Sequence, residues 1–114
     1  MPTNRSPSDD QAFAQLADDC LSKLLRQLDD IDPDELDADH ASGVLTMTFA
    51  DGRKCIANRQ AAAHQIWLAE GASAWHFARD DRTGQWLDTR GRGSLQQILS
   101  AILTERLGRP IEIS

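Results

Sequence analysis

Nine acidic side chains lie within twenty-two residues, between positions 18 and 39, and the chemistry open to them is the binding of hard cations. Carboxylate oxygens suit calcium, manganese, ferrous iron and especially ferric iron. The chain has no EF-hand spacing, no HExxH and no Glu-x-x-His pair of a di-iron bundle, so we expect weak binding at several places, with water completing each shell. A solvated face that only keeps the protein soluble is the alternative. The candidate metal ligands are Asp18, Asp19, Asp29, Asp30, Asp32, Asp34, Glu35, Asp37 and Asp39.

A second candidate site is a group of amides around a tryptophan. In a strand, Ile66 and Leu68 would share one face and Trp67 would lie on the other. The aliphatic pair suits the core, which leaves the tryptophan outside, near the amides of residues 58–60 on a neighbouring strand. This composition is typical of a protein-contact patch. A tryptophan in the core, with the aliphatic pair under a loop, is the alternative. The candidate partner-binding residues are Asn58, Gln60, Gln65 and Trp67.

A helix and a strand must position the acidic residues. Apolar side chains recur at three- and four-residue steps, which predicts an amphipathic helix from Asp9 to about Asp30 with acids on its outer face. Pro33 stops this helix, and residues 35–40 then alternate as an edge strand with its acids outward. The expected apolar stripe of the helix is Phe13, Leu16, Cys20, Leu24, Leu28 and Ile31.

The rest of the chain predicts a meander of strands and then a second helix. Ser94 and Gln97 have the spacing of a capping box, and Gly108 ends the apolar stripe that follows. Residues 111–113 are either an edge strand or a tail packed between the helices. Further strands are expected at residues 44–49, 53–58, 65–69, 74–78 and 85–88.

The order of elements predicts an α+β fold: a two-layer sandwich with two helices packed on one face of an antiparallel sheet of about six strands. The chain of 114 residues is long enough for one core, and we expect a single domain over residues 9–114 after a disordered lead over residues 1–8. The start of the chain is polar and no apolar run reaches the length of a membrane span, so a cytoplasmic protein without a membrane partner is expected. Cys20 and Cys55 lack metal or redox spacing and are interpreted as buried free thiols.

Charge is divided unevenly along the chain, whose net charge is −6. Residues 1–40 carry eleven acidic and three basic side chains, a net charge of −8, whereas residues 41–114 carry seven and nine, a net charge of +2. An acidic pole attracts cations or basic partners. It also argues against nucleic acid as the main ligand, because phosphates would be repelled.

No side chain has the setting of a catalytic group, so we do not expect an enzyme. Ser94 is a helix cap, and no phosphate-binding glycine loop is present. The three histidines are scattered without ligand spacing and are expected at the surface or half-buried. The sequence Arg90-Gly91-Arg92-Gly93 is basic but short, and is interpreted as a loop before the second helix.

From about Phe13 to the C-terminus, the chain resembles the frataxin family in its bacterial form. The resemblance implies the same α+β sandwich, an acidic ridge that attracts iron on the first helix and first strand, and a sheet surface around Asn58 and Trp67 that meets partners. The chain departs from the family pattern at Leu25 and Arg26, where acidic residues are common in the family, and the positive charge of Arg26 is expected to weaken a metal position there. The segments that carry the resemblance are residues 28–30, 43–49, 58–60, 65–69 and 75–77, together with Trp86.

The function that the resemblance implies is iron binding in iron–sulfur cluster assembly. The protein would modulate the complex of a cysteine desulfurase and its scaffold protein, with delivery of iron as a further role, and would hold ferrous or ferric iron weakly. We expect a monomer that can form oligomers under iron. A metal-independent acidic adaptor for basic partner proteins and a ferroxidase or iron-storage protein are the alternatives.

Overall fold

The computed structural model describes residues 7–114 of the chain, with side chains from residue 9 onward. Helix α1 (Pro7–Leu28) opens the described part, two residues before its expected start. Of the expected lead over residues 1–8, residues 1–6 lie outside the described residues, and residues 7 and 8 belong to α1. The helix also ends two residues earlier than expected, so Asp29 and Asp30 fall in the turn that follows it.

Six antiparallel strands form one sheet in which neighbours in sequence are neighbours in space. The order places β1 at one edge and β6 at the other, as expected for the acidic strand. The ends of the strands differ from the expected ends by at most two residues. The strands are β1 (Leu36–Ala41), β2 (Val44–Phe49), β3 (Lys54–Gln60), β4 (Gln65–Glu70), β5 (Ser73–Arg79) and β6 (Trp86–Asp88).

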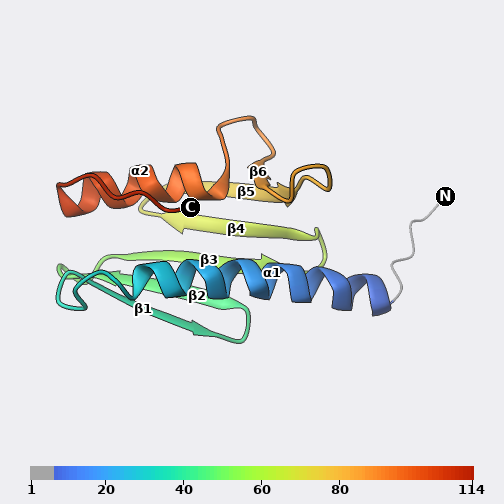
Figure 1. Cartoon of the computed structure of the whole chain (residues 1–114), viewed down its shortest axis with the longest axis horizontal. Helices are drawn as coiled ribbons and strands as arrows, with labels where there is room; N and C mark the ends of the chain where they lie inside the picture. Colours follow the sequence, from blue (N-terminus) through green and yellow to red (C-terminus); the bar gives the residue numbers. More distant parts are fainter. Residues whose placement is uncertain (1–6) are drawn as a thin grey trace.

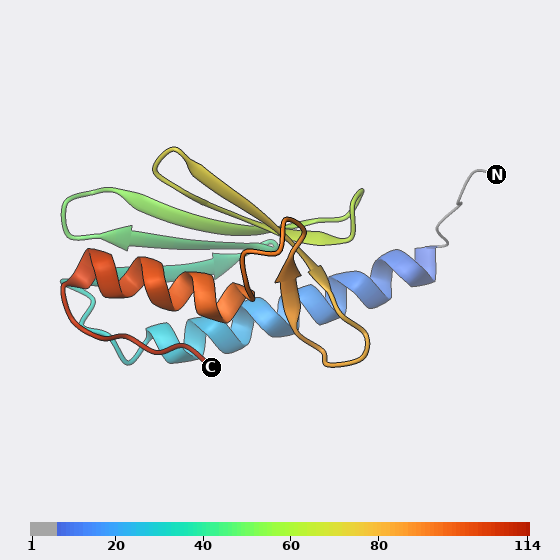
Figure 2. The same cartoon turned by 90° about the horizontal axis from the view of Figure 1, so that it is seen from above.

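Both helices cover the same face of the sheet, α1 over β1 to β3 and α2 (Leu95–Leu107) over the other half (Figures 1 and 2). The core lies between the two layers, and alternation along the strands fills it. In β4, for example, Ile66 and Leu68 are fully buried. The other face of the sheet is left to solvent. The expected two-layer α+β sandwich is thus confirmed. Neither helix among residues 7–114 combines the length and apolarity that a membrane crossing requires.

The buried stripe of α1 is rotated from the expected one. Leu16 is 40% exposed and Cys20 is only partly buried, whereas Ala17 and Leu21 are fully buried in their place. At about 100° per residue around the helix axis, the middle of the buried face lies between the directions of Ala17 and Leu24. Leu16 points away from this direction, toward solvent. Alanine allows this rotation because it lets the helix backbone approach the sheet closely. The other expected members of the stripe, Phe13, Leu24, Leu28 and Ile31, are buried.

The second helix has the caps that the sequence predicts. The hydroxyl of Ser94 accepts from the backbone N–H of Gln97, whose side chain accepts from the backbone of Ser94, and Gly108 ends the helix in the left-handed conformation. The tail then takes the second of its two expected courses. The backbone N–H of Ile113 donates to Ser100 of α2 at 2.9 Å, and Ser114 exchanges hydrogen bonds with Gln27 of α1. It therefore packs between the helices.

Candidate functional site

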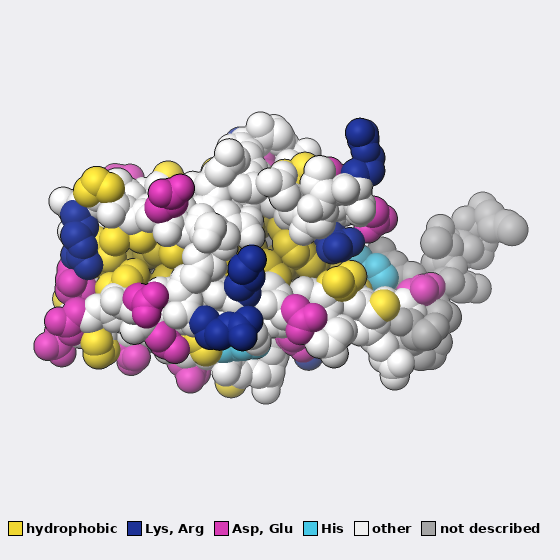
Figure 3. Space-filling view, viewed as in Figure 1, with side chains coloured by type: hydrophobic (Ala, Val, Ile, Leu, Met, Phe, Trp, Pro, Cys, Tyr) yellow, Lys and Arg dark blue, Asp and Glu magenta, His cyan; other side chains and the backbone are white. Residues whose placement is uncertain are grey.

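The first candidate surface is the acidic end, which we define as Asp29, Asp30, Asp32, Asp34 and Glu35. These residues occupy the connection from α1 to β1, where acidic side chains gather at one end of the molecule (Figure 3). The connection is ordered by its own side chains, since Oδ1 of Asp32 accepts from the backbone N–H of Asp34 at 2.9 Å. Within the described part of the chain, none of the four aspartates forms an ion pair. Four exposed carboxylates within six residues therefore create a strongly negative local potential.

Glu35 differs from these aspartates because it is paired. Its carboxylate accepts from Nη1 of Arg109, which follows the cap of α2. The hydrogen bond that Arg109 donates to Glu35 and the nearby charges of Glu35 and Asp32 raise the pKa of Arg109. The pair joins the start of β1 to the C-terminal end of α2. Because Arg109 neutralises Glu35, only the other four carboxylates of the acidic end attract a cation with their full negative charge.

Asp18 and Asp19 stand apart from the acidic end, on the middle of α1. Asp18 pairs with Arg59 of β3, and Asp19 accepts from the side-chain amide of Gln15 at 2.8 Å. A helix rises about 1.5 Å per residue, which puts Asp19 roughly 15 Å from Asp29 along the axis. The two groups of carboxylates therefore cannot share an ion.

The edge-strand acids Asp37 and Asp39 lie on the face of the sheet that the helices leave open. They pair in register with Thr48 and Thr46 of β2, and both are exposed. The intervening Ala38 faces the helices and packs against the core. The nine candidate ligands thus form three groups: the middle of α1, the acidic end and the outer side of β1.

Convergence on one ion is not seen. Among the residues whose side chains the structure describes, no three His, Cys, Asp or Glu side chains gather as a metal centre would. The donor set is nevertheless all oxygen and anionic, which fits a hard cation that keeps most of its water. The surface therefore fits weak, spread binding at the acidic end better than one coordination sphere.

The histidines also lie away from the acidic end, as half-buried or exposed side chains. Nε2 of His64 lies 2.7 Å from Oδ1 of Asp10, and its ring stacks on Phe13 with centroids 4.7 Å apart. Nδ1 of His40 lies 3.5 Å from the hydroxyl of Ser22. These contacts tie sheet and loop residues to α1, and they account for two of the three rings.

The second candidate surface is the outer sheet face, which we define as Asn58, Gln60, Gln65, Trp67 and His76. The register places Asn58 beside Trp67 and Gln60 beside Gln65 across β3 and β4. Trp67 is half-buried, and its indole N–H donates to Oε1 of Gln65 at 2.8 Å. Sequence alternation thus placed the tryptophan on the correct side of the sheet. The side-chain amide of Gln65 therefore fixes the orientation of the indole ring.

His76 is the member of the outer sheet face that sequence reasoning missed. It pairs in register with Trp67, and the two rings stack with centroids 4.2 Å apart and planes 11° apart. The same alternation could have predicted its position, because His76 and the buried Phe77 point to opposite faces of β5 as Trp67 and Ile66 do in β4. Val44 and Ile56 add exposed aliphatic surface to the same face, each 36% exposed.

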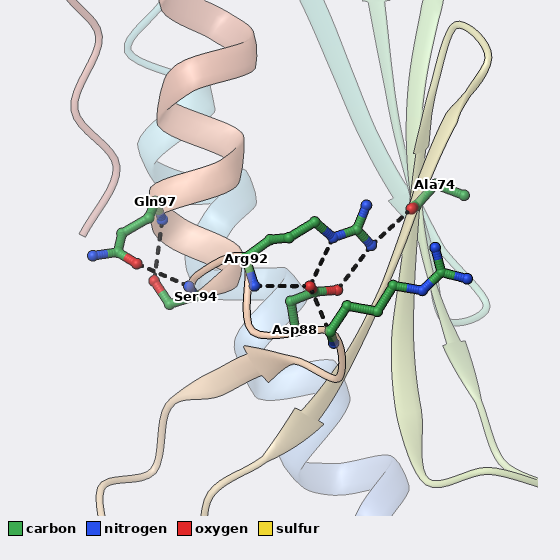
Figure 4. A network of polar contacts seen from close by, with 6 residues as sticks. Ala74, Asp88, Arg92, Ser94 and Gln97 are labelled. Atoms are coloured by element: carbon green, nitrogen blue, oxygen red, sulfur yellow. Dashed lines mark hydrogen bonds and ion pairs between the residues drawn. The ribbon is translucent and has the colours of Figure 1, made fainter.

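A buried carboxylate, also missed, organises the loop between β6 and α2. The Asp88 side chain is fully buried and accepts from Nε and Nη2 of Arg92 at 2.8 and 3.0 Å, and from the backbone N–H groups of Arg90 and Arg92 (Figure 4). Arg92 reaches on to the carbonyl of Ala74 in β5 at 3.2 Å. The side-chain hydrogen bond from Arg92 is the main reason that the pKa of Asp88 falls to about 2. The expected loop is therefore tightly held.

Two helices on one face of a six-stranded antiparallel sheet, with charged and amide groups on the surface, define the class: a small α+β sandwich. The model of the frataxin-like domain matches residues 6–109. The chain belongs to the frataxin family.

Curated relatives agree with this assignment. The chain is 35% identical over 108 residues to the iron–sulfur cluster assembly protein CyaY of Delftia acidovorans, covering 92% of this chain and 96% of that one. It is 39% identical over 105 residues to the protein of the same name from Thioalkalivibrio sulfidiphilus, covering 91% and 98%.

Solved structures show the same fold. The frataxin of Psychromonas ingrahamii superposes with a TM-score of 0.82 at 28% identity, covering 92% of this chain and 97% of that one. A ferrous complex of trimeric frataxin from Saccharomyces cerevisiae has a TM-score of 0.71 at 25% identity, covering 96% and 94%.

Proposed function

We propose that this protein acts in iron–sulfur cluster assembly as a non-enzymatic, iron-binding regulator of a cysteine desulfurase and its scaffold protein, with delivery of iron as a further role. The observation that carries the proposal is the acidic end, where four aspartates without ion pairs in the described structure stand on one short connection. Ferrous and ferric ions are drawn to such a surface, and most of their ligands stay water. Family membership and the names of the relatives support the pathway.

Iron is the ligand in this proposal, and the acidic end has two uses. A hydrated cation is attracted by several carboxylates at once, so the ion exchanges quickly and binds weakly. The same carboxylates complement a basic patch on a partner protein. The outer sheet face, with Trp67 at its centre, gives a second contact made of amide and aromatic side chains. Cation binding and partner binding can therefore be separated by mutation.

The cation half of the proposal is tested by titrating the apo protein with ferrous iron under nitrogen and following amide NMR signals, with calcium as the comparison ion. We expect signal loss centred on residues 29–35 at lower concentrations of iron than of calcium. Asp29→Asn/Asp30→Asn should weaken it several-fold. Asp81→Asn is the control, because that aspartate is exposed in the turn between β5 and β6, away from the acidic end. Equal, unlocalised responses to both ions would refute the cation half.

The regulatory half is tested in a reconstituted desulfurase and scaffold reaction. Charge reversal at Asp29, Asp30 and Asp32 should abolish the effect of the protein on the rate, and Trp67→Arg should do so separately. Asp81→Lys is a control for a charge reversal, since that side chain is exposed in the turn between β5 and β6. Regulation that survives in both test variants would exclude the proposal.

A metal-independent acidic adaptor is the second candidate, and one observation favours it: the described carboxylates do not converge as metal ligands. An adaptor would bind its partner with the same affinity with and without iron, whereas the regulator would not. The ferroxidase alternative requires a defined di-iron site. Oxygen consumption in proportion to added ferrous iron would support it over both other candidates.

A further inference from the structure

A small cavity opens beside the outer sheet face, at the end of β6. It has a volume of about 250 Å³ and is lined by Ala74, His76, Thr89, Arg90 and Arg92. Two arginines and a histidine surround this space in a chain whose net charge is −6. The basic loop that the sequence set apart therefore contributes to a formed surface feature.

Arg92 is the fixed wall of the cavity. Its guanidinium is held by the buried carboxylate of Asp88 and by the carbonyl of Ala74, as Figure 4 shows, and it lies 5.6 Å from the centre of the Trp75 ring. These contacts leave it little conformational freedom to lose when a ligand arrives. Asp88 also neutralises its charge, so Arg92 contributes shape and remaining N–H groups more than net charge.

Arg90 is the charged wall. Its backbone N–H donates to Asp88 at 3.2 Å, which fixes where the side chain starts. Across the described residues its guanidinium has no hydrogen-bond or ion-pair partner. With Asp88 and Arg92 cancelling, the cavity holds one uncompensated positive charge, offered by a group that binds carboxylates in a bidentate manner.

His76 connects this cavity with the outer sheet face. His76 is one of the residues that line the cavity, and its ring stacks on Trp67. If a polypeptide covers Trp67, the side chains that follow in its sequence would therefore lie over the cavity. Continuity with that face and the single positive charge both favour one carboxylate on such a polypeptide. A nucleic acid strand is disfavoured, because its many phosphates would be repelled by a protein whose net charge is −6.

We propose that the cavity between Arg90, Arg92 and His76 receives an aspartate or glutamate side chain from the partner segment that covers Trp67. This inference rests on the proposed function, whose partner surface it extends. It assigns the partner segment a sequence character: an acidic side chain next to an apolar one. The partner would thus be recognised through two kinds of charged group: basic groups that contact the acidic end and an acidic side chain that enters the cavity.

The probe is an acetylated and amidated hexapeptide of alternating leucine and glutamate, compared with its leucine–glutamine counterpart. In an NMR titration, the acidic peptide should shift the amides of residues 89–92 and the indole N–H of Trp67, and the neutral peptide should not. Arg90→Gln should raise the dissociation constant about fivefold, the size expected for one exposed charge pair. Arg82→Gln, an exposed arginine at the opposite end of β5, should leave it unchanged.

Equal binding of the acidic peptide to Arg90→Gln and to the unchanged protein would overturn the inference. So would saturation of the same signals by inorganic phosphate or by a short oligothymidine at a lower concentration, because the cavity would then be a general anion site. Peptide binding weakened in Arg90→Gln and unchanged in Arg82→Gln supports it.

The reconstituted desulfurase and scaffold complex separates this inference from the proposed function. If the unchanged protein does not bind the complex, the proposed function fails, and the peptide titration still decides the chemistry of the cavity. If it binds and Arg90→Glu binds as well as Arg82→Glu, the inference fails and the proposed function stands. A selective loss with Arg90→Glu supports both.

Discussion

Arg59 extends its side chain from β3 over Gly43 to pair its guanidinium with the carboxylate of Asp18 on α1. A Cβ on Gly43 would lie 2.6 to 2.9 Å from the Nε, Cδ and Cγ atoms of Arg59. The backbone N–H of Arg59 also donates to the carbonyl of Gly43 at 3.0 Å. The turn between β1 and β2 thus leaves room for the Arg59 side chain, which connects the sheet to α1. Asp18, counted as a candidate metal ligand, holds the two layers together.

Gly43→Ala is expected to destabilise the protein more than Gly52→Ala does. Both glycines have positive φ, 77° and 87°, so each substitution costs about 1 kcal/mol of backbone strain. Only at Gly43 does a new Cβ meet a neighbour, which adds about 1–3 kcal/mol of overpacking. Urea unfolding of both variants measures the difference. In an Arg59→Ala background the excess at Gly43 should vanish; an excess that persists would show that Arg59 does not cause it.

The local parts of this structure could be predicted from sequence, and the long-range ones could not. Alternation along residues 65–69 predicted Trp67 opposite the core, with a core tryptophan as the alternative, because strand periodicity depends only on neighbouring residues. The rotation of α1 toward Ala17 and Leu21 depends on how closely the helix approaches the sheet. The pair of Arg59 with Asp18 joins residues 41 positions apart, and no local spacing reports such a contact.

The candidate site divides in the same way. The acidic end follows from one run of residues after a helix, and its exposure was foreseeable. Its separation from Asp37 and Asp39 follows from the side of the sheet on which β1 places them, which required the register with β2. The cavity at Arg90 depends on the buried Asp88, and a single aspartate in a short strand does not show from sequence that it is buried.

Stability should depend on Asp88 in acid. Hydrogen bonds from Arg92 hold its pKa at about 2 in the folded protein, below the ordinary value of 3.8. The folded state therefore binds its proton less readily than the unfolded state, and Asp88 stabilises the fold fully above about pH 4. This contribution should be lost as the pH falls from about 4 to about 2. Asp88→Asn should lower the free energy of unfolding at pH 7 by about 1–3 kcal/mol, because a charged hydrogen-bond acceptor is lost.

The pH dependence distinguishes this role from simple packing. Urea unfolding between pH 2 and pH 7 should show a smaller loss of stability in acid for Asp88→Asn than for the unchanged protein. Asp81→Asn, an exposed aspartate, is the control and should follow the unchanged protein. Parallel curves for Asp88→Asn and the unchanged protein would show that Asp88 does not titrate in this range.

The two thiols should react slowly in the folded protein. Burial is the main cause that raises the pKa of Cys55 to about 12 and that of Cys20 to about 11. The thiolate is the reactive form, so alkylation at pH 8 should be much slower than for a free cysteine. Cys20 is partly exposed and should be labelled before Cys55, which waits for unfolding. Mass spectrometry of iodoacetamide-treated protein, with a urea-unfolded control, measures both rates; rapid native labelling of Cys55 would contradict its burial.

Trp67 should matter more for binding than for folding, and a comparison with its neighbour Leu68 shows why. Leu68 is 1% exposed in the core, so Leu68→Ala should cost about 2–5 kcal/mol of stability. Trp67 lies on the opposite face, where it contacts His76 and Gln65. Trp67→Ala loses one ring stack and one hydrogen bond, which together account for about 1–2 kcal/mol.

For partner binding we expect the opposite order, so that Trp67→Ala has a larger effect than Leu68→Ala. A half-buried tryptophan held flat by a neighbouring ring is the type of side chain that dominates a protein interface, where its truncation often costs more than about 2 kcal/mol. Trp67→Ala should therefore weaken binding to the desulfurase and scaffold complex by more than about tenfold, and His76→Ala by less, since it removes only the support of the ring. Calorimetric titration at a temperature where all variants are folded compares them. If Trp67→Ala unfolds as readily as Leu68→Ala and binds normally, the tryptophan serves the core, and the outer sheet face loses its central residue as a contact surface.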